Sequence, residues 1–191
     1  QLGSFCGNGG RCVVAFAKYL GIIDKQTNLA AFDGLHDATI SGNIVSLSMR
    51  DVDHVQTYPT HTFLDTGSPH HVEFVKDTKN IDVRTQGALI AHNETYGEEG
   101  TNVNFVSVIK DRHIQVRTFE RGVENETLSC GTGVTAAALA AFSTGKVTNS
   151  NIEVHTLGGD LTVSFTPSGK GFSDIILTGP TELVFSGILE L

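Results

Sequence analysis

The sequence predicts an α+β fold that consists of many short antiparallel strands and two prominent helices. Short segments of alternating apolar and polar residues are separated by turn residues along the chain, which is typical of antiparallel strands rather than of repeated βαβ units. Two segments are expected to be the helices: residues 11–20, where apolar side chains recur at helical spacing, and the alanine-rich residues 134–142. Each follows a Cys-Gly-x-Gly sequence, at residues 6–9 and 130–133. This repeat predicts two halves of similar design, whose helix N-termini lie near a shared interface.

The remaining elements are predicted from alternation and from turn residues. Residues 44–50 alternate apolar side chains with serines after the turn residues 41–43, which indicates a hairpin with residues 38–40. The polar residues 24–28 are expected to form a loop, and residues 82–92 a short helix. In chain order, the expected strands are residues 38–40, 44–50, 61–65, 71–75, 103–109, 114–119, 152–156, 161–165, 175–177 and 182–189.

The composition restricts the classes of protein to consider. With 191 residues, of which 39% are hydrophobic and 18% charged, the chain can form a packed core of one or two domains. A formal net charge of -8 argues against nucleic acid and anionic membranes as partners. No apolar run approaches the ~20 residues that span a bilayer. Three cysteines, an odd number, fit a reducing compartment better than a disulfide framework, so we expect a cytoplasmic protein.

The two Cys-Gly-x-Gly sequences predict a pair of reactive thiols. A cysteine thiol ordinarily has a pKa of about 8.5, and the partial positive charge at a helix N-terminus is expected to lower that pKa. One such thiol indicates a nucleophile. Two that face each other can remove a proton from one face of a carbon and return a proton to the other, which inverts its configuration. Backbone N–H groups in the glycine-rich turns can bind a carboxylate and stabilise the charge that develops when the neighbouring C–H bond breaks.

Two longer motifs carry a resemblance to a known family. Residues 5–12, Phe-Cys-Gly-Asn-Gly-Gly-Arg-Cys, and residues 120–133, which run from Glu-Arg-Gly to Leu-Ser-Cys-Gly-Thr-Gly, resemble the two signature motifs of the diaminopimelate epimerases. Residues 66–70 and 101–105 are similar to two further family segments, and the resemblance covers the length of the chain. Enzymes of this family interconvert LL- and meso-diaminopimelate in lysine and peptidoglycan-precursor biosynthesis, without pyridoxal phosphate or metal. The resemblance therefore implies an isomerase with no cofactor, whose partner is a small-molecule substrate.

Other functions stay open beside this one. The related proline racemases share the fold and the cysteine pair, but they usually have His where this chain has Asn8, and they lack a Glu-Arg-Gly segment like residues 120–122. These differences favour the diaminopimelate branch over an isomerase that acts on a proline-type imino acid. A third interpretation is a non-catalytic or redox role, in which Cys6 and Cys130 form a disulfide or the chain is an inactive binding module.

The resemblance implies the catalytic residues. Cys6 and Cys130 would be the two bases. Glu120 would contact the reacting amine and help to set the ionisation of the thiols, and His70 would lie beside a cysteine in a similar role. Without the resemblance, His70 would be an ordinary loop residue and Glu120 part of a surface ion pair.

The resemblance also implies the substrate-binding residues. Arg121 and Asn102 would hold the distal amino-acid end of the substrate, where a guanidinium group matches a carboxylate. Ser68 stands where the family has a substrate-binding Asn, which shortens the reach but retains a hydroxyl. Glu120 would also bind the substrate, since a carboxylate complements an ammonium group. Backbone amides for the reacting carboxylate would come from Gly7, Asn8, Gly131 and Thr132.

The resemblance further implies two pseudo-symmetric domains, each an antiparallel sheet or barrel wrapped around a central helix. Residues 1–53 with a returning strand at 179–191 would form the first domain, and residues 54–178 the second. The family has an upstream segment of several strands that this chain lacks, so the first domain is expected to be incomplete and the isolated chain inactive or dependent on that segment. We expect its helix to show exposed apolar surface unless a second chain, as in a homodimer, or a separate segment covers it. Cys12, in that helix, is predicted to be a buried small apolar residue.

Overall fold

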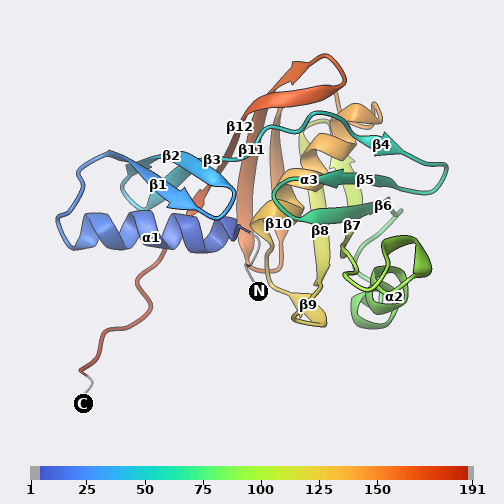
Figure 1. Cartoon of the computed structure of the whole chain (residues 1–191), viewed down its shortest axis with the longest axis horizontal. Coiled ribbons are helices and arrows are strands. Elements are labelled where there is room, and N and C mark those ends of the chain that lie inside the picture. Colours follow the sequence, from blue (N-terminus) through green and yellow to red (C-terminus); the bar gives the residue numbers. More distant parts are fainter. Residues whose placement is uncertain (1–4, 189–191) are drawn as a thin grey trace.

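The computed structural model describes residues 5–188, which form a large sheet with helices packed on it (Figure 1). The helices are α1 (Gly7–Tyr19), α2 (Val83–Ala91), the short 3₁₀ helix η1 (Glu94–Tyr96) and α3 (Gly131–Ser143). The strands are β1 (Gln26–Ala31), β2 (Gly34–Ser41), β3 (Ile44–Ser48), β4 (Gln56–Thr57), β5 (Thr62–Asp65), β6 (Pro69–Phe74), β7 (Asn102–Lys110), β8 (His113–Glu120), β9 (Asn125–Thr127), β10 (Asn151–Thr156), β11 (Gly159–Ser168) and β12 (Gly171–Pro180). The predicted α+β class is confirmed.

The described strands form one sheet with the order β1-β2-β3-β12-β11-β10-β8-β7-β6-β5-β4, and β9 pairs with β8. Most neighbours are antiparallel, as the alternation predicts, and the predicted hairpins β2–β3, β7–β8 and β10–β11 are all present. Two pairs, β6–β7 and β8–β10, are parallel. A parallel pair needs a crossover connection, and α2 and α3 lie in these two connections. Both crossovers bring helices back onto the sheet.

Helix α3 lies in the centre of the larger part of the sheet (Figure 1). Every residue from 131 to 141 is buried, and the helix packs against β5 to β8 and β10 to β12. A helix that is apolar all round is expected to be buried on all sides, and alanines allow the surrounding strands to approach closely. Because the strands enclose α3, they fix the position of its first residue, and of Cys130 directly before it.

Helix α1 covers β1 to β3 with one face only. Val14 and Gly10 are buried toward the sheet, whereas Val13, Phe16, Tyr19 and Leu20 leave 53–66% of their surface exposed. The predicted exposure of apolar surface on this helix is confirmed. The predicted burial of Cys12 is wrong, because Cys12 lies on the same uncovered face and is exposed.

Two segments differ from their prediction. Residues 24–28 were expected to be a loop, but β1 begins at Gln26 and pairs with β2, because backbone hydrogen bonds to a neighbouring strand do not require apolar side chains. Residues 182–189 were expected to be a strand, but residues 181–188 contain no strand and residue 189 lies outside the described residues. After the Thr181 N–H donates to the Asn43 carbonyl at 2.8 Å, this segment pairs with no strand in the described chain.

Strand β12 joins the two parts of the sheet. It pairs with β11 on one side and with β3 on the other, so the backbone hydrogen bonds are continuous from β1 to β4. The division into two domains at residue 53 stays a prediction. Among residues 5–188, no helix has the length and hydropathy that are needed to cross a membrane.

Candidate active site

Cys6 and Cys130 cap their helices in the same way. Cys6 precedes α1 with extended backbone angles of φ -107° and ψ 103°, and its sulfur accepts a hydrogen bond from the Gly9 N–H at 3.3 Å. Cys130 precedes α3 with φ -118° and ψ 113°, and its sulfur accepts from the Gly133 N–H at 3.4 Å. A side chain that accepts from the third residue of a helix is an N-cap. The sequence repeat is therefore a repeat of local structure.

The N-termini of the two helices meet through glycines. A Cβ atom on Gly7 would lie 3.3 Å from the Cα atom of Gly131, and one on Gly131 would lie 3.0 Å from the Cα atom of Gly7. The same two Cβ atoms would lie 2.9 and 3.1 Å from the Cδ2 atom of Leu177 in β12. Only residues without a side chain allow this approach. The prediction that the two helix N-termini lie near a shared interface is confirmed.

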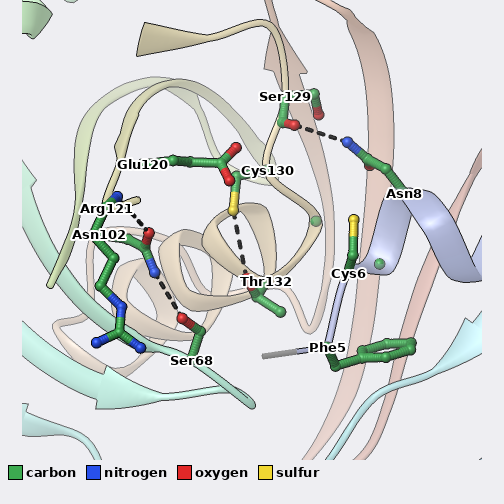
Figure 2. Close-up of a pocket in the computed structure, with 12 residues that line it drawn as sticks. Phe5, Cys6, Asn8, Ser68, Asn102, Glu120, Arg121, Ser129, Cys130 and Thr132 are labelled. Carbon is green, nitrogen blue, oxygen red and sulfur yellow. Dashed lines mark hydrogen bonds between the residues drawn. The ribbon is translucent and has the colours of Figure 1, made fainter. Parts of the chain in front are cut away.

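A cavity of about 150 Å³ lies between the two capping cysteines (Figure 2). Figure 2 shows the Cys6 side chain on one side of this space and the Cys130 side chain on the other. Polar groups from both halves of the chain converge on a space suited to a small molecule. The lining residues are Phe5, Cys6, Gly7, Asn8, Ser68, Asn102, Glu120, Arg121, Ser129, Cys130, Gly131 and Thr132.

The environment of the two thiols is not the same. Cys130 is 8% exposed, whereas Cys6 is exposed at the edge of the site. The pKa of Cys130 is raised to about 12, first by burial and then by the charge of the Glu120 carboxylate, while hydrogen bonds from Thr132 and Gly133 oppose the shift. The expectation that the helix N-terminus lowers this pKa is wrong, because desolvation outweighs the cap. Cys130 is therefore a neutral thiol at pH 7 and can donate a proton.

Asn102 connects three segments at the far side of the cavity. Its amide Nδ2 donates to the Ser68 Oγ at 2.8 Å and to the Pro69 carbonyl at 3.0 Å, and its Oδ1 accepts from the Arg121 N–H at 3.1 Å. The side chain is buried, so each of these bonds replaces water. This network fixes the position of Ser68 relative to the residue that follows Glu120.

The charged residues of the site are placed by side-chain and backbone bonds. The Glu120 carboxylate accepts from the Thr127 hydroxyl, which holds its end of β8 against β9. The Arg121 guanidinium donates to the Glu99 carbonyl at 3.0 Å and, more weakly, to the Gly100 carbonyl at 3.5 Å. Both side chains line the cavity, so one anionic and one cationic group are available to a ligand.

His70 lies behind the cavity and does not line it. Its ring is fully buried, and Nδ1 lies 3.1 Å from the Nδ2 atom of Asn104. Burial lowers the pKa of His70 to about 3, and the charge of Arg121 contributes to the shift, so the ring is neutral at pH 7. The role of His70 beside a cysteine stays a prediction.

Three residues of the site were not singled out from the sequence. Phe5 and Ser129 line the cavity directly before the two cysteines, and adjacency to the motifs was the available signal. Asn104 is buried against the start of α3, since a Cβ on Gly133 would lie 2.4 Å from its Oδ1. It follows Asn102 by two positions in β7, so the two asparagines lie on one face of the strand.

Comparison with known proteins identifies the family. The family model described as diaminopimelate epimerase matches residues 62–184. The diaminopimelate epimerase of Flavobacterium psychrophilum is 50% identical over 183 residues, which cover 95% of this chain and 72% of that enzyme. The chain belongs to the diaminopimelate epimerase family. Another member, from Chlorobaculum tepidum, is 41% identical over 199 residues that cover 99% of this chain and 76% of the relative.

Solved structures support the fold. A probable proline racemase from Agrobacterium radiobacter matches with a TM-score of 0.70 at 18% sequence identity, over 96% of this chain and 68% of that chain. A hydroxyproline epimerase from Agrobacterium vitis matches with a TM-score of 0.70 at 17% identity, over 93% of this chain and 65% of that chain. At such identities the likeness shows the fold alone. The diaminopimelate epimerase family thus shares its architecture with other epimerases and racemases.

Proposed function

We propose that the protein is a cofactor-independent epimerase that interconverts LL- and meso-diaminopimelate with two thiols. The observation that carries this proposal is the placement of Cys6 and Cys130 as N-caps of two abutting helices at one cavity, in a member of the diaminopimelate epimerase family. A pair of thiols on opposite sides of one carbon is what inversion through a carbanion requires.

The thiols exchange roles between the two directions of the reaction. In one direction the Cys6 thiolate takes the proton from the α-carbon, the C–H electron pair stays on the carbon, and the Cys130 thiol delivers a proton to the opposite face. The raised pKa of Cys130 supports its starting state as the proton donor. After one turnover Cys6 is the thiol and Cys130 the thiolate, which is the state that accepts the other isomer. No net proton is consumed.

The helix N-termini stabilise the charge that develops in this reaction. The backbone N–H groups of Gly7, Asn8, Gly131 and Thr132 occupy the first turns of α1 and α3, where they lack partners within their own helix. These donors would bind the α-carboxylate, onto which the carbanion charge is delocalised. The abutting glycines leave room for the carboxylate to approach both helices.

The remaining lining residues would select the substrate. The Glu120 carboxylate complements the reacting ammonium group. Arg121, Asn102 and Ser68 lie together through the bonds of Asn102 and would bind the second amino-acid end of diaminopimelate. A proline-type substrate has no such second end, so this cluster favours diaminopimelate over an imino acid.

Deuterium incorporation at the α-carbon in D₂O tests this function. Completed by the upstream segment that the resemblance implies, the chain is expected to exchange the α-proton of LL-diaminopimelate, and Cys6→Ser and Cys130→Ser are expected to lose epimerisation. Exchange with proline instead would replace the diaminopimelate assignment with the imino-acid alternative. Absence of exchange with both substrates in the completed chain would contradict an isomerase function and support the non-catalytic or redox role.

We further propose that two copies of the chain associate through the exposed face of α1. Phe16 and Tyr19 on this face and Leu183 after β12 border a groove of about 320 Å³, and burial of apolar surface stabilises association by about 25 cal/mol per Å². Sedimentation equilibrium is expected to give a dimer for the parent chain and a monomer for Phe16→Ser. A monomeric parent chain would contradict the proposal.

Two further proposals concern organisation and location. We propose that residues 54–178 form one domain and the flanking residues the other, which limited proteolysis near residue 53 would test.

A cytoplasmic location is supported by the cysteines, since Cys6, Cys12 and Cys130 are all free thiols. Fractionation of cells that produce the protein would test it.

A further inference from the structure

Arg11 is a buried cation at the start of α1. Its side chain is 6% exposed, its Nε atom is buried without a hydrogen-bond partner, and among residues 5–188 it forms no ion pair. Burial lowers its pKa from the usual value because desolvation penalises the charged form. A buried charge without a carboxylate destabilises a fold. Its place here therefore calls for a function other than stability.

The guanidinium group donates to two neighbours. One nitrogen, Nη2, donates to the Asn8 Oδ1 at 3.1 Å, and Nη1 donates to the Gly7 carbonyl at 3.4 Å. The other end of the Asn8 amide, Nδ2, donates to the Ser129 carbonyl at 2.8 Å (Figure 2). Two hydrogen bonds in series thus connect Arg11 to Asn8 and Asn8 to Ser129, from α1 to the residue before Cys130. We call this pair of bonds the Arg11–Asn8 bridge.

Arg11 also decides which way the Asn8 amide points. A guanidinium group has donors and no acceptor, so it can bind only the oxygen of the amide. The nitrogen of the amide is then turned toward the Ser129 carbonyl, which requires a donor. The Ser129 carbonyl selects the same orientation of the amide, so the two contacts act together.

The second half of the molecule meets the same local need without a charge. Thr135 follows Cys130 by five positions, as Arg11 follows Cys6, and its hydroxyl donates to the Gly131 carbonyl at 3.0 Å. This bond is equivalent to the one from Arg11 to Gly7. A neutral side chain is therefore sufficient for a helix start of this kind. The additional reach of Arg11 serves the contact with Asn8.

We propose that Arg11 is a positioning residue, which acts through Asn8 to fasten the first turn of α1 to Ser129 and so holds Cys6 opposite Cys130. Its consequence for catalysis depends on the proposed function, because a two-thiol reaction requires both sulfurs to reach the same carbon. The contact between the glycines brings the helix starts together, and the Arg11–Asn8 bridge restrains their remaining movement.

Cross-linking of the two thiols tests the geometry without reference to activity. In a Cys12→Ser background, at a pH alkaline enough for Cys130 to be alkylated, a short bis-alkylating reagent joins Cys6 to Cys130 at a rate that depends on how the sulfurs are held. Arg11→Met is expected to slow this cross-linking about tenfold, the scale of a lost charged hydrogen bond, with no change in the alkylation of Cys6 by a monofunctional reagent. Arg11→Lys, which retains the charge and a donor, is expected to recover part of the rate. Thr135→Val is the matched control and is expected to cross-link like the parent.

Stability and kinetics separate positioning from a structural role. Arg11→Met removes the cost of burying an unpaired charge, which offsets the hydrogen bonds that Asn8 and Gly7 lose, so the urea midpoint of this variant is expected to change little. Its kcat for diaminopimelate is expected to fall about 10- to 100-fold, as misplacement of catalytic groups does, with a smaller change in KM. In the double variant Arg11→Met/Asn8→Ala the losses of kcat from the two single variants are expected not to add, because both residues act through the same Arg11–Asn8 bridge.

Each outcome of these experiments decides a separate question. A lower urea midpoint with unchanged cross-linking would make Arg11 structural and overturn the proposal. A parent chain whose thiols do not cross-link would overturn it as well, since the sulfurs would then not be opposed. If cross-linking behaves as expected but the parent catalyses no α-proton exchange, the bridge stands and the proposed function fails.

Discussion

The backbones of Gly7 and Gly131 touch at the centre of the molecule, and a Cβ on either residue would lie 3.0–3.3 Å from the Cα atom of the other. Each glycine is the first residue of a helix that a cysteine caps. The contact therefore restricts the separation of the two capping thiols through backbone atoms, with the Leu177 side chain packed against both glycines.

Alanine at either glycine is expected to separate the helices. Gly7→Ala must displace Leu177 or the Gly131 backbone, and overpacking of this kind costs about 1–3 kcal/mol of unfolding free energy. The kcat is expected to fall about 100-fold, because the sulfurs move apart. Gly9→Ala is the control for folding, since its Cβ would meet only the Cys6 side chain at an ordinary 3.5 Å. Equal urea midpoints for Gly7→Ala and Gly9→Ala would contradict a tight contact.

The ionisation of Cys130 is expected to respond to Glu120. The pKa of Cys130 is raised to about 12, first by burial and then by the negative charge of Glu120. In a Cys6→Ser/Cys12→Ser background, alkylation of Cys130 should therefore stay slow at pH 8 and accelerate only at strongly alkaline pH. Glu120→Gln removes the negative charge, so the midpoint of the pH profile should move to lower pH. A midpoint near 8.5, the ordinary value for a thiol, would contradict the burial of this thiol.

The buried ring of His70 is expected to make the fold sensitive to acid. Its pKa is about 3 in the folded chain, against about 6.5 in an unfolded one. The unfolded state binds the proton first, so the stability contributed by the neutral ring is complete above about pH 6.5 and is lost as the pH falls toward 3. The expected slope is about 1.4 kcal/mol per pH unit for one proton.

Urea unfolding between pH 7 and pH 4 measures this slope. His70→Gln should reduce the slope of the unfolding free energy against pH by the contribution of one proton, even if the variant is less stable at every pH. His54 is exposed, so His54→Gln is the matched control and should retain the parental slope. The acid-sensitivity prediction is falsified if both variants and the parent have the same slope.

The network of Asn102 is expected to control substrate binding more than chemistry. Asn102→Ala leaves the Arg121 N–H and the Pro69 carbonyl without their partner, which costs about 1–3 kcal/mol for each buried group that stays unpaired. We expect KM for diaminopimelate to rise more than kcat falls, because the proposed function assigns this network to the distal end of the substrate. Steady-state kinetics measures the two constants, and Asn93→Ala, an exposed change, is the control. A fall in kcat alone would assign Asn102 to the reacting end instead.

Most of the site could be predicted because its residues lie in two short motifs. These motifs contain the cysteine caps, the glycine turns, Glu120 and Arg121. Two capping thiols become opposed as soon as the two motifs meet in the fold. The pKa of Cys130 could not be predicted, since it depends on how completely the strands around α3 exclude water. Arg11 was missed for a similar reason: its charge acquires a role only through Ser129, 118 positions away in the chain.

The fold was predicted where side chains alternate and missed where they do not. Strand β1 begins with the polar residues 26–28 and is held by its backbone pairing with β2, which no local pattern reveals. The segment 182–189 is rich in apolar residues without alternating, and residues 181–188 have no strand to pair with in the described chain. Alternation predicts which face of a strand is buried, whereas the existence of a strand depends on its neighbour.

The position of β12 has a consequence for how the protein is made. Leu177 of this strand packs against both Gly7 and Gly131, and the strand is inserted between β3 and β11. It is also the last strand to be synthesised among the described elements. The side chain that packs against both helix starts is therefore absent from the nascent chain until residues 171–180 have left the ribosome. Cys130 is itself added 124 residues after Cys6, so the opposed arrangement of the two sulfurs is completed late in the synthesis of the described residues.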